Sequence, residues 1–170
     1  MKRIVCVLIL LNAINAFAYR ISNVGKNFIK HKEQCSLVSY WDSNGYSIGW
    51  GHHGTDVKRN MRISKAYANM LFNKDIKIIE VAANKLIKDL PYKYHFSQNF
   101  FDGLCSFIYN CGESGVKQSK FYKRLRMCRV RNGIMNKQDL HYAIAHVKTS
   151  RISAPGHKSR RYDEHKLMIK

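Results

Sequence analysis

The chain has 170 residues, enough for one domain with its own core and too few for two comfortable ones. Hydrophobic residues make up 45% of the sequence and only two prolines occur, which excludes a disordered, tail-like protein. Its 30 Lys and Arg against 11 Asp and Glu give a net charge of +19, which favours an anionic partner such as nucleic acid, acidic lipid or an anionic cell wall, or else forms a solvated basic face.

The first residues have the pattern of an export signal. Two basic residues precede an apolar run at residues 4–11, and Ala16-Phe17-Ala18 supplies the small residues of a cleavage site. We therefore expect residues 1–18 to be an export signal, with Tyr19 as the mature start. The run is short for a membrane span, which needs about 20 apolar residues, although a retained signal anchor is an alternative. Export argues against a nucleic-acid partner.

A short helix is expected next. Val24, Phe28 and Ile29 recur at helical spacing between residue 21 and about residue 32. Glu33 is therefore expected on, or directly after, a rigid element.

A hairpin follows this helix. Residues 37–41 and 46–50 read as strands around the stretch 42–45, because Asn44-Gly45 tolerates the positive φ angles of a tight turn. Asp42 then lies at the tip of the hairpin. Glycines at 49, 51 and 54 interrupt the second strand and indicate a close backbone approach or a bend toward the next element, and the small sheet is expected to end there.

The remainder of the chain is predicted to be helical. Ser64 can cap a long linker helix to about Lys88, and Ser97 can cap a helix so apolar through Ile108 that it should form a core. Further helices are expected at about 119–128, at 137–147 behind Asn136, and from about 158 onward. The sequence thus predicts an α+β fold in one domain, 19–170: a hairpin lobe at about 33–60, a linker helix at about 64–88 and a helical lobe at about 95–170, with a cleft between the lobes.

Four cysteines remain once the signal is removed, at positions 35, 105, 111 and 128. If Cys105 and Cys111 share a helix they lie about 9 Å apart, too far for a disulfide, so Cys35 would pair with one of them and Cys128 with the other. Four reduced core cysteines are the alternative. No metal site is expected, because the sequence lacks Cys-x-x-Cys and His141 and His146 do not share a helical face.

Two acidic residues flank the first strand, Glu33 before it and Asp42 after it. Cleaving a glycosidic bond requires one acid to protonate the leaving oxygen and a second carboxylate across the sugar. At the helix end Glu33 is expected against apolar residues, which would raise the pKa of its carboxyl, whereas Asp42 at a polar turn would stay ionised. The alternative is that Glu33 and Asp42 are surface charges without a catalytic role.

The pattern around these acids resembles the phage-type lysozymes, the muramidase endolysins of glycoside hydrolase family 24. That family has a Glu near the end of its first helix, then Tyr-x-Asp, Gly-Tyr and Thr-Ile-Gly-x-Gly-His. The matching residues are Glu33, Tyr40-Trp41-Asp42, Gly45-Tyr46 and Ser47-Ile48-Gly49-Trp50-Gly51-His52. Similarity continues through residues 100–107 and 110–116, and the stretch 155–164 is similar to the family's Gly-x-x-x-Arg-Arg-x-x-Glu.

The resemblance implies a lysozyme-like fold and hydrolysis, without a cofactor, of the β-1,4 bond between N-acetylmuramic acid and N-acetylglucosamine. Glu33 matches the general acid and Asp42 the base for water in an inverting reaction. Ser47 matches a Thr whose hydroxyl helps to hold that water. The turn before Ser47 is one residue shorter than the common family form, so a closer pair of carboxyls and a retaining route are an alternative.

Further matches are implied outside this trio. His52 and Asp75 fall where the family has a structural ion pair, with a catalytic role as the alternative. Tyr109 and Ser119 match positions that line the saccharide cleft. A core aromatic is the alternative for Tyr109, and a helix cap is the alternative for Ser119.

The expected partner is therefore bacterial peptidoglycan, cut by an exported monomer in the periplasm or cell wall of a host, with the N-terminal segment able to associate transiently with the membrane. One alternative is a lytic transglycosylase, which cuts the same bond without water. Another is a non-enzymatic basic protein whose C-terminal helices disrupt bilayers. A nucleic-acid binder is supported by charge alone and is not expected.

Overall fold

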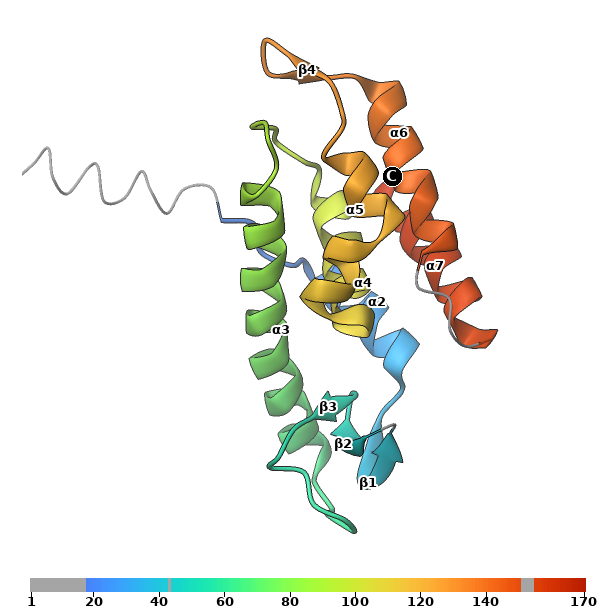
Figure 1. Cartoon of the computed structure of the whole chain (residues 1–170). Helices are drawn as coiled ribbons and strands as arrows, with labels where there is room; N and C mark the ends of the chain where they lie inside the picture. Colours follow the sequence, from blue (N-terminus) through green and yellow to red (C-terminus); the bar gives the residue numbers. More distant parts are fainter. Residues whose placement is uncertain (1–17, 43, 151–154) are drawn as a thin grey trace, which may run out of the picture.

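A computed structural model of the chain describes residues 18–42, 44–150 and 155–170. A small sheet lies at one end of the molecule and most of the helices at the other, with the long helix α3 running between them (Figure 1). The predicted export signal lies outside the described residues except for Ala18. None of the helices in the described part is long and apolar enough to cross a bilayer.

The helix that carries Glu33, α2 (Asn23–Glu33), is fixed at its start by the helical lobe. Ser22 caps it by accepting a hydrogen bond from the Gly25 backbone N–H at 3.2 Å. The buried carboxylate of Asp102 in turn accepts hydrogen bonds from both the backbone N–H and the hydroxyl of Ser22. Gly25 permits this approach, because a Cβ there would lie 2.7 Å from Asp102 Cγ. The first turn of the helix that ends at Glu33 is therefore fixed by contacts with Asp102 of the helical lobe.

The sheet has three antiparallel strands in the order β1 (Ser36–Asp42), β2 (Gly45–Gly49) and β3 (His52–His53). The two strands predicted from the sequence are present, but the expectation that the sheet ends after them is wrong. Gly49 and Gly51, at φ of 68° and 90°, turn the chain back so that β3 pairs with β2. These glycines therefore build a third strand instead of stopping the sheet.

The first hairpin also differs in detail from its prediction. Gly45 is the first residue of β2, paired with Asp42, and it is not at positive φ. A Cβ at this position would lie 2.8 Å from Cε1 of His53. Glycine at position 45 thus leaves room for a histidine ring, and a larger residue there would displace that ring.

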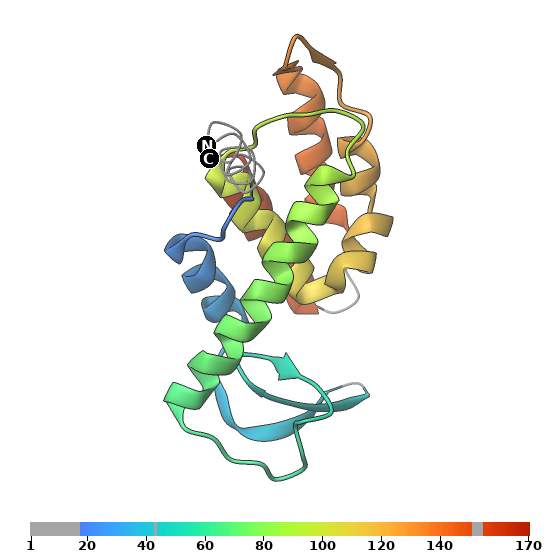
Figure 2. The ribbon, with the colours of Figure 1, turned by 90° about the vertical axis from the view of Figure 1, so that its left-hand side faces the viewer.

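Helix α3 (Lys65–Lys88) agrees with the predicted linker helix. Ser64 caps it by accepting from the Tyr67 backbone N–H at 3.1 Å. Its Leu71 packs with Ile48 and Val57 under the sheet, and its C-terminal half packs into the core of the helical lobe. Figure 2 shows α3, in green, crossing the front of the molecule from the sheet to the helical lobe.

The helical lobe surrounds α4 (Gln98–Gln118), which lies between α3 and α7 (Figure 1). Ser97 caps α4 as predicted, but the helix is longer than expected and continues past a kink at Gly112, whose φ is 69°. The elements after it are α5 (Lys120–Leu125), α6 (Lys137–Ala145), the 3₁₀ helix η1 (His146–Thr149) and α7 (Pro155–Met168).

One element of this lobe was not predicted. The strands β4 (Val130–Arg131) and β5 (Ile134–Met135) form a second hairpin around Asn132 and Gly133, whose φ angles are 49° and 75°. Two successive residues at positive φ match the turn that Asn-Gly favours. The same dipeptide that predicted the first hairpin was therefore the available signal for this one.

None of the four cysteines outside the predicted signal is in a disulfide in the structure. Cys105 and Cys128 are buried, and Cys35 and Cys111 are half-buried. The structure thus agrees with the alternative of four reduced cysteines. It does not contain the predicted disulfides that join Cys35 and Cys128 to Cys105 and Cys111.

Candidate active site

Glu33 faces a guanidinium group contributed by the last helix. Arg160 Nη1 donates to Glu33 Oε1 at 2.5 Å, and the two side chains are 8% and 19% exposed. The expectation of apolar surroundings for Glu33 is therefore wrong, because the nearest polar partner of its carboxylate is a cation. The second oxygen, Oε2, lies toward Gly51, where a Cβ would be only 3.2 Å away from it. Glycine at position 51 keeps that side of the carboxylate open.

Arg160 is itself held firmly. Its Nε donates to Glu164 Oε1 at 3.1 Å and its Nη2 to the Ser106 carbonyl at 3.3 Å. Burial lowers the pKa of Arg160, but the charges of Glu33 and Glu164 outweigh this and leave its pKa raised. Arg161 binds the other oxygen of Glu164. The guanidinium that contacts Glu33 is thus charged and fixed in orientation.

Asp42 lies at the end of β1, close to the buried hydroxyl of Ser47 on β2. Ser47 Oγ is 3.4 Å from Asp42 Oδ2 and 3.1 Å from Nδ1 of His53 on β3. The register pairs Tyr40 with Ser47 and Ser47 with His53, so these three residues form one row across the sheet. The three strands therefore bring a carboxylate, a hydroxyl, a phenol and an imidazole together.

Tyr40 connects the two predicted catalytic acids. Burial raises the pKa of its phenol, the negative charges of Asp42 and Glu33 raise it further, and a hydrogen bond with Ser47 opposes them. The charges of both carboxylates thus influence one phenol, although they come from different elements. Asp42 and Ser47 are in direct contact, and Glu33 is linked to them through its charge at Tyr40.

Tyr109 lies beside the same site. A Cβ on Gly51 would lie 3.8 Å from its Cε1, and its hydroxyl donates to the Trp50 carbonyl at 2.9 Å. Burial raises the pKa of Tyr109, and the charges of Asp75 and Glu33 add to this. The ring therefore borders Glu33 while its hydroxyl is used by the protein, and a contact with the saccharide stays a prediction.

Ser119 is placed differently. It is buried, donates to the Val116 carbonyl at 2.6 Å, and accepts from the Tyr122 backbone N–H at 3.2 Å. These are the contacts of a helix cap between α4 and α5, which is the alternative raised from the sequence. They lend no support to saccharide binding by Ser119, which stays a prediction.

The predicted contact between His52 and Asp75 is present. His52 Nδ1 lies 2.9 Å from both carboxylate oxygens of Asp75, and Nε2 lies 3.2 Å from Asp56 Oδ2. Burial raises the pKa of Asp75, opposed by its hydrogen bond with His52, whereas the bond with His52 lowers the pKa of the exposed Asp56. The imidazole therefore joins β3 to α3 and to the loop that follows β3.

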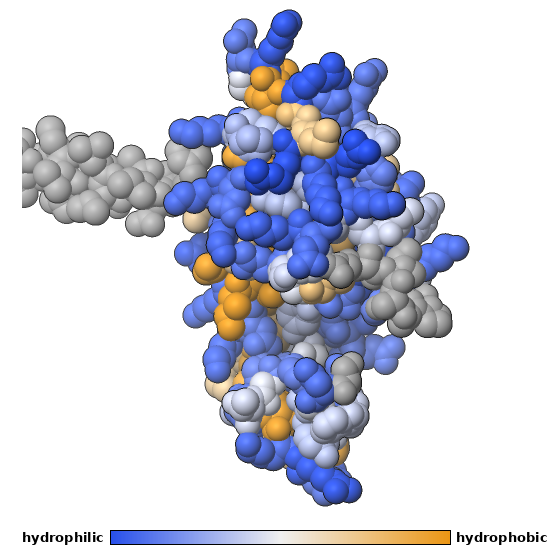
Figure 3. All heavy atoms as spheres, in the orientation of Figure 1, coloured by the Kyte–Doolittle hydropathy of each residue, from blue (hydrophilic) through white to orange (hydrophobic). Residues whose placement is uncertain are grey.

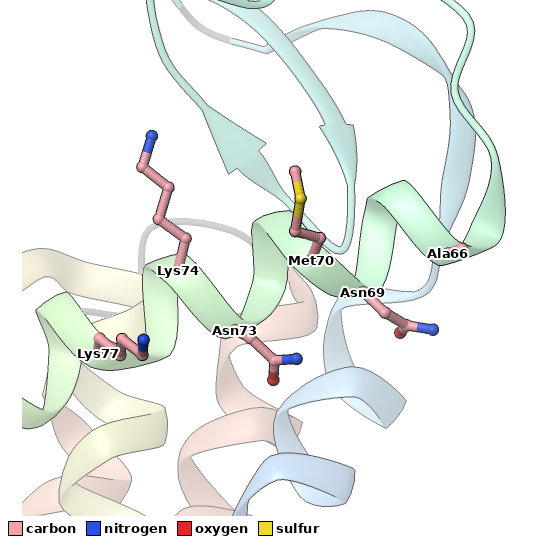
Figure 4. A pocket seen from close by; sticks show the side chains of 6 residues that line it. All are labelled: Ala66, Asn69, Met70, Asn73, Lys74 and Lys77. Atoms are coloured by element: carbon pink, nitrogen blue, oxygen red, sulfur yellow. The ribbon is translucent and has the colours of Figure 1, made fainter.

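A hollow of about 510 Å³ lies elsewhere, on the face of α3 shown in Figure 4. It is lined by Ala66, Asn69, Met70, Asn73, Lys74 and Lys77. No predicted catalytic residue is among these residues, so this hollow is separate from the carboxylates. In the part of the chain that the structure describes, no three His, Cys, Asp or Glu residues are grouped to hold a metal ion.

Sequence reasoning missed three members of this site: Arg160, Tyr40 and His53. Arg160 belongs to the Arg-Arg-x-x-Glu pattern and Tyr40 to Tyr-x-Asp, so both were visible in motifs but carried no assigned role. His53 directly follows the motif histidine, and only the third strand reveals that its ring reaches Ser47.

Comparisons with known proteins agree with this geometry. Residues 30–164 match the family model described as phage lysozyme. The chain is 32% identical over 109 residues to the endolysin of Bacillus phage PZA, covering 62% of this chain and 40% of the relative. It is 32% identical over 113 residues to the endolysin of Salmonella phage P22, covering 64% of this chain and 74% of the relative. The solved endolysin from Escherichia coli O157:H7 phage FAHEc1 has a TM-score of 0.69 at 30% identity, covering 89% of this chain and 94% of that one.

The chain thus spans about 40% of the length of the Bacillus phage relative and about three quarters of the P22 relative. The match at 30–164 includes the helix end that carries Glu33, the hairpin that carries Asp42 and Ser47, and Arg160. On the extent of that match, the chain belongs to the phage lysozyme family.

Proposed function

We propose that this protein is an endolysin that hydrolyses the β-1,4 bond between N-acetylmuramic acid and N-acetylglucosamine of bacterial peptidoglycan. The observation that carries the proposal is a pair of carboxylates with different polar partners, both within the stretch 30–164 that matches the phage lysozyme model. Glu33 is bonded to Arg160, and Asp42 lies beside Ser47. A pair of differently placed carboxylates is what glycoside hydrolysis requires.

In this proposal Glu33 is the general acid. Its Oε1 is bound by Arg160, so the orientation of the carboxyl group is fixed, and Oε2 lies toward the open side at Gly51. A proton on Oε2 would pass to the glycosidic oxygen as the bond to the sugar carbon breaks. Arg160 acts as a positioning residue, because it contacts the acid and not the sugar.

Asp42 is the proposed base and Ser47 its helper. A water between them would lose its proton to Asp42 while its oxygen bonds to the sugar carbon from the face opposite the leaving group, which inverts the anomeric configuration. The hydroxyl of Ser47 is already within 3.4 Å of Asp42 Oδ2. This pairing favours hydrolysis over a lytic transglycosylase, which has no need of a water site.

The expected setting is the cell wall of a bacterial host, reached by export, with the protein acting as a monomer and with transient membrane association through the N-terminal segment. Figure 3 shows one face of the molecule, covered mainly by hydrophilic residues. With a net charge of +19, long-range attraction to an anionic wall is expected, and added salt would weaken it.

The test is clearance of purified peptidoglycan by the wild type, Glu33→Gln and Asp42→Asn. Both variants should lose at least about 100-fold in rate, because each removes a proton-transfer group, while their circular dichroism matches the wild type. The melting temperature of Glu33→Gln should fall, because the buried Arg160 loses its charged partner, so the rates are compared at a temperature at which every variant is folded. Glu113→Gln is the matched control, since Glu113 is on the far part of α4 and pairs with Lys85. Undiminished clearance by Glu33→Gln would refute the acid role. Anhydromuramic ends in the product mass spectrum would instead indicate a transglycosylase.

A further inference from the structure

His53 is a site residue with no assigned role, and its ring contacts two residues of β2 although His53 is exposed. Its Nδ1 lies 3.1 Å from Ser47 Oγ, and the ring passes over Gly45, where a Cβ would be 2.8 Å from Cε1 and 3.1 Å from Nε2. Gly45 and Ser47 are two residues apart on β2 and so share a face of the sheet. The missing side chain at Gly45 thus provides the space in which the imidazole reaches Ser47.

The number of protons on Ser47 limits what this hydroxyl can do. It has one proton to donate, and its neighbours are a carboxylate, which accepts, an imidazole nitrogen, which donates or accepts according to its protonation, and the phenol of Tyr40. Ser47 can donate to Asp42 and be bonded to His53 at the same time only if Nδ1 of His53 carries a proton. With a bare Nδ1, the ring competes with Asp42 for the single serine proton.

We propose that His53 is a positioning residue that keeps the Ser47 hydroxyl pointing at Asp42 by donating from Nδ1. The inference rests on the proposed function, because the role matters only if Asp42 and Ser47 act on water. The hydroxyl of Ser47, which the proposed function assigns to holding water, lies on the short hairpin of β1 and β2. The contact from His53 on β3 would orient this hydroxyl from outside the hairpin. The backbone pairing of β3 does not require the imidazole, so a side-chain substitution separates the two contributions.

Other titratable groups face the same row. Asp42 and Tyr40 approach it from β1, and Glu33 from the end of α2 acts on Tyr40. The His53 ring therefore shares this row with two carboxylates and a phenol.

The first test compares substitutions that place a donor at different distances from the backbone. In His53→Asn the side-chain amide nitrogen can occupy the place of Nδ1, whereas in His53→Gln it reaches the place of Nε2. We expect His53→Ala to lower kcat about tenfold with KM within about twofold, His53→Asn to regain most of kcat, and His53→Gln to regain little. Equal rescue by Asn and Gln, or an unchanged kcat in His53→Ala, would overturn the inference.

A double-mutant cycle tests whether His53 acts through Ser47. In a Ser47→Ala background, His53→Ala should add almost nothing, because the hydroxyl that it directs is gone. A full tenfold further loss would show that His53 acts by another route and would overturn the proposal. Melting temperatures of all variants identify any effect that comes from unfolding.

A readout without activity keeps this inference apart from the proposed function. Nitrogen-15 spectra of the full chain labelled in histidine report which ring nitrogen of His53 carries a proton. A protonated Nδ1 that responds to Ser47→Ala supports the role, and a bare Nδ1 overturns it even if peptidoglycan is hydrolysed. An inactive wild type would instead refute the proposed function, and active wild type with inactive Glu33→Gln would support it whatever the result at His53.

Discussion

Arg160 and Glu33 stand 127 positions apart in the chain, yet Arg160 Nη1 lies 2.5 Å from Glu33 Oε1. Arg160→Lys keeps the positive charge and loses the fixed fork of donors that also binds Glu164 and the Ser106 carbonyl. We expect kcat on peptidoglycan to fall about tenfold or more, with a smaller change in KM. An unaltered kcat in a folded Arg160→Lys protein would show that orientation of Glu33 does not depend on the guanidinium. Lys117→Arg, a reverse exchange on the exposed end of α4, is the control.

Substitutions at two glycines of positive φ can distinguish the effect of backbone strain from the effect of contact with Glu33. Gly51 is at φ 90° with Glu33 Oε2 only 3.2 Å from an added Cβ, whereas Gly133 is at φ 75° in open space. Alanine at either position should cost about 1 kcal/mol of stability from strain alone. Only Gly51→Ala should also reduce peptidoglycan clearance, by about tenfold or more. Equal activities of the two variants would contradict the close contact of Gly51 with Glu33.

The link between His52 and Asp75 should matter more to stability than the link to Asp56. The Asp75 side chain is 19% exposed and that of Asp56 is 57% exposed. His52→Ala strips the half-buried Asp75 carboxylate of its partner and should lower the free energy of unfolding by about 3 kcal/mol, whereas Asp56→Asn should change it little.

The pH dependence of that loss gives a second check. Burial already raises the pKa of Asp75, and removing His52 removes an interaction that lowers it. A carboxyl whose folded pKa exceeds its unfolded pKa of about 3.9 destabilises the fold when ionised, and this cost disappears as the pH falls through the folded value. Denaturant titrations should therefore show a smaller difference between wild type and His52→Ala at acid pH than at pH 7. A constant difference would rule out the Asp75 carboxyl as its source.

Two histidines in the helical lobe should make the fold sensitive to acid. His146 Nε2 and His165 Nδ1 are buried without a hydrogen-bond partner among the described residues. Burial lowers the pKa of both, and neighbouring cations such as Arg124 and Lys148 lower it further. Above the unfolded pKa of about 6.5 both states are neutral and nothing is lost, whereas below it the unfolded chain binds protons first and stability falls.

The measurement is the melting temperature as the pH is lowered from 8 to 5. His165→Gln should reduce the steepness of the decline, because the new side chain cannot become charged. His31→Gln, on an exposed position of α2, should leave the decline as it is in the wild type. Identical declines in all three proteins would exclude His165 as a contributor.

Thiol reactivity should follow burial. The half-buried Cys35 and Cys111 should react with a thiol reagent in the native protein, whereas Cys105 should react only on unfolding, because burial raises the pKa of its thiol well above the ordinary value. In guanidinium chloride without reductant, every cysteine of the protein should titrate. A shortfall of two or four thiols would indicate disulfides.

Local signals predicted most of the elements. Ser64 and Ser97 cap α3 and α4 as expected, because a capping side chain and the apolar period that follows it lie within one short stretch. The third strand was not predicted, since Gly49 and Gly51 read equally well as an end or as a reversal until a pairing partner is known. The Asn132-Gly133 hairpin had a local signal that could have been used.

Only part of the site was predicted, again because local sequence patterns do not reveal contacts between distant segments. Glu33, Asp42 and Ser47 were found because they share one short motif that spans a helix end and a hairpin. The environment of Glu33 was misjudged, since the guanidinium that faces it belongs to α7 and no periodicity near residue 33 indicates such a distant contact. The ring of His53 reaches Ser47 only through a strand that the sequence did not reveal.

The helix that bears Glu33 is tied at its beginning to Asp102 of α4 and at its end to Arg160 of α7. Both ties are encoded long after α2, and domains are built on the ribosome from the N-terminus onward. A nascent chain that has exposed only α2 and the sheet therefore lacks the contacts that hold its proton donor. The protein should consequently become able to cut its substrate only when α7 has been synthesised and has packed against α2.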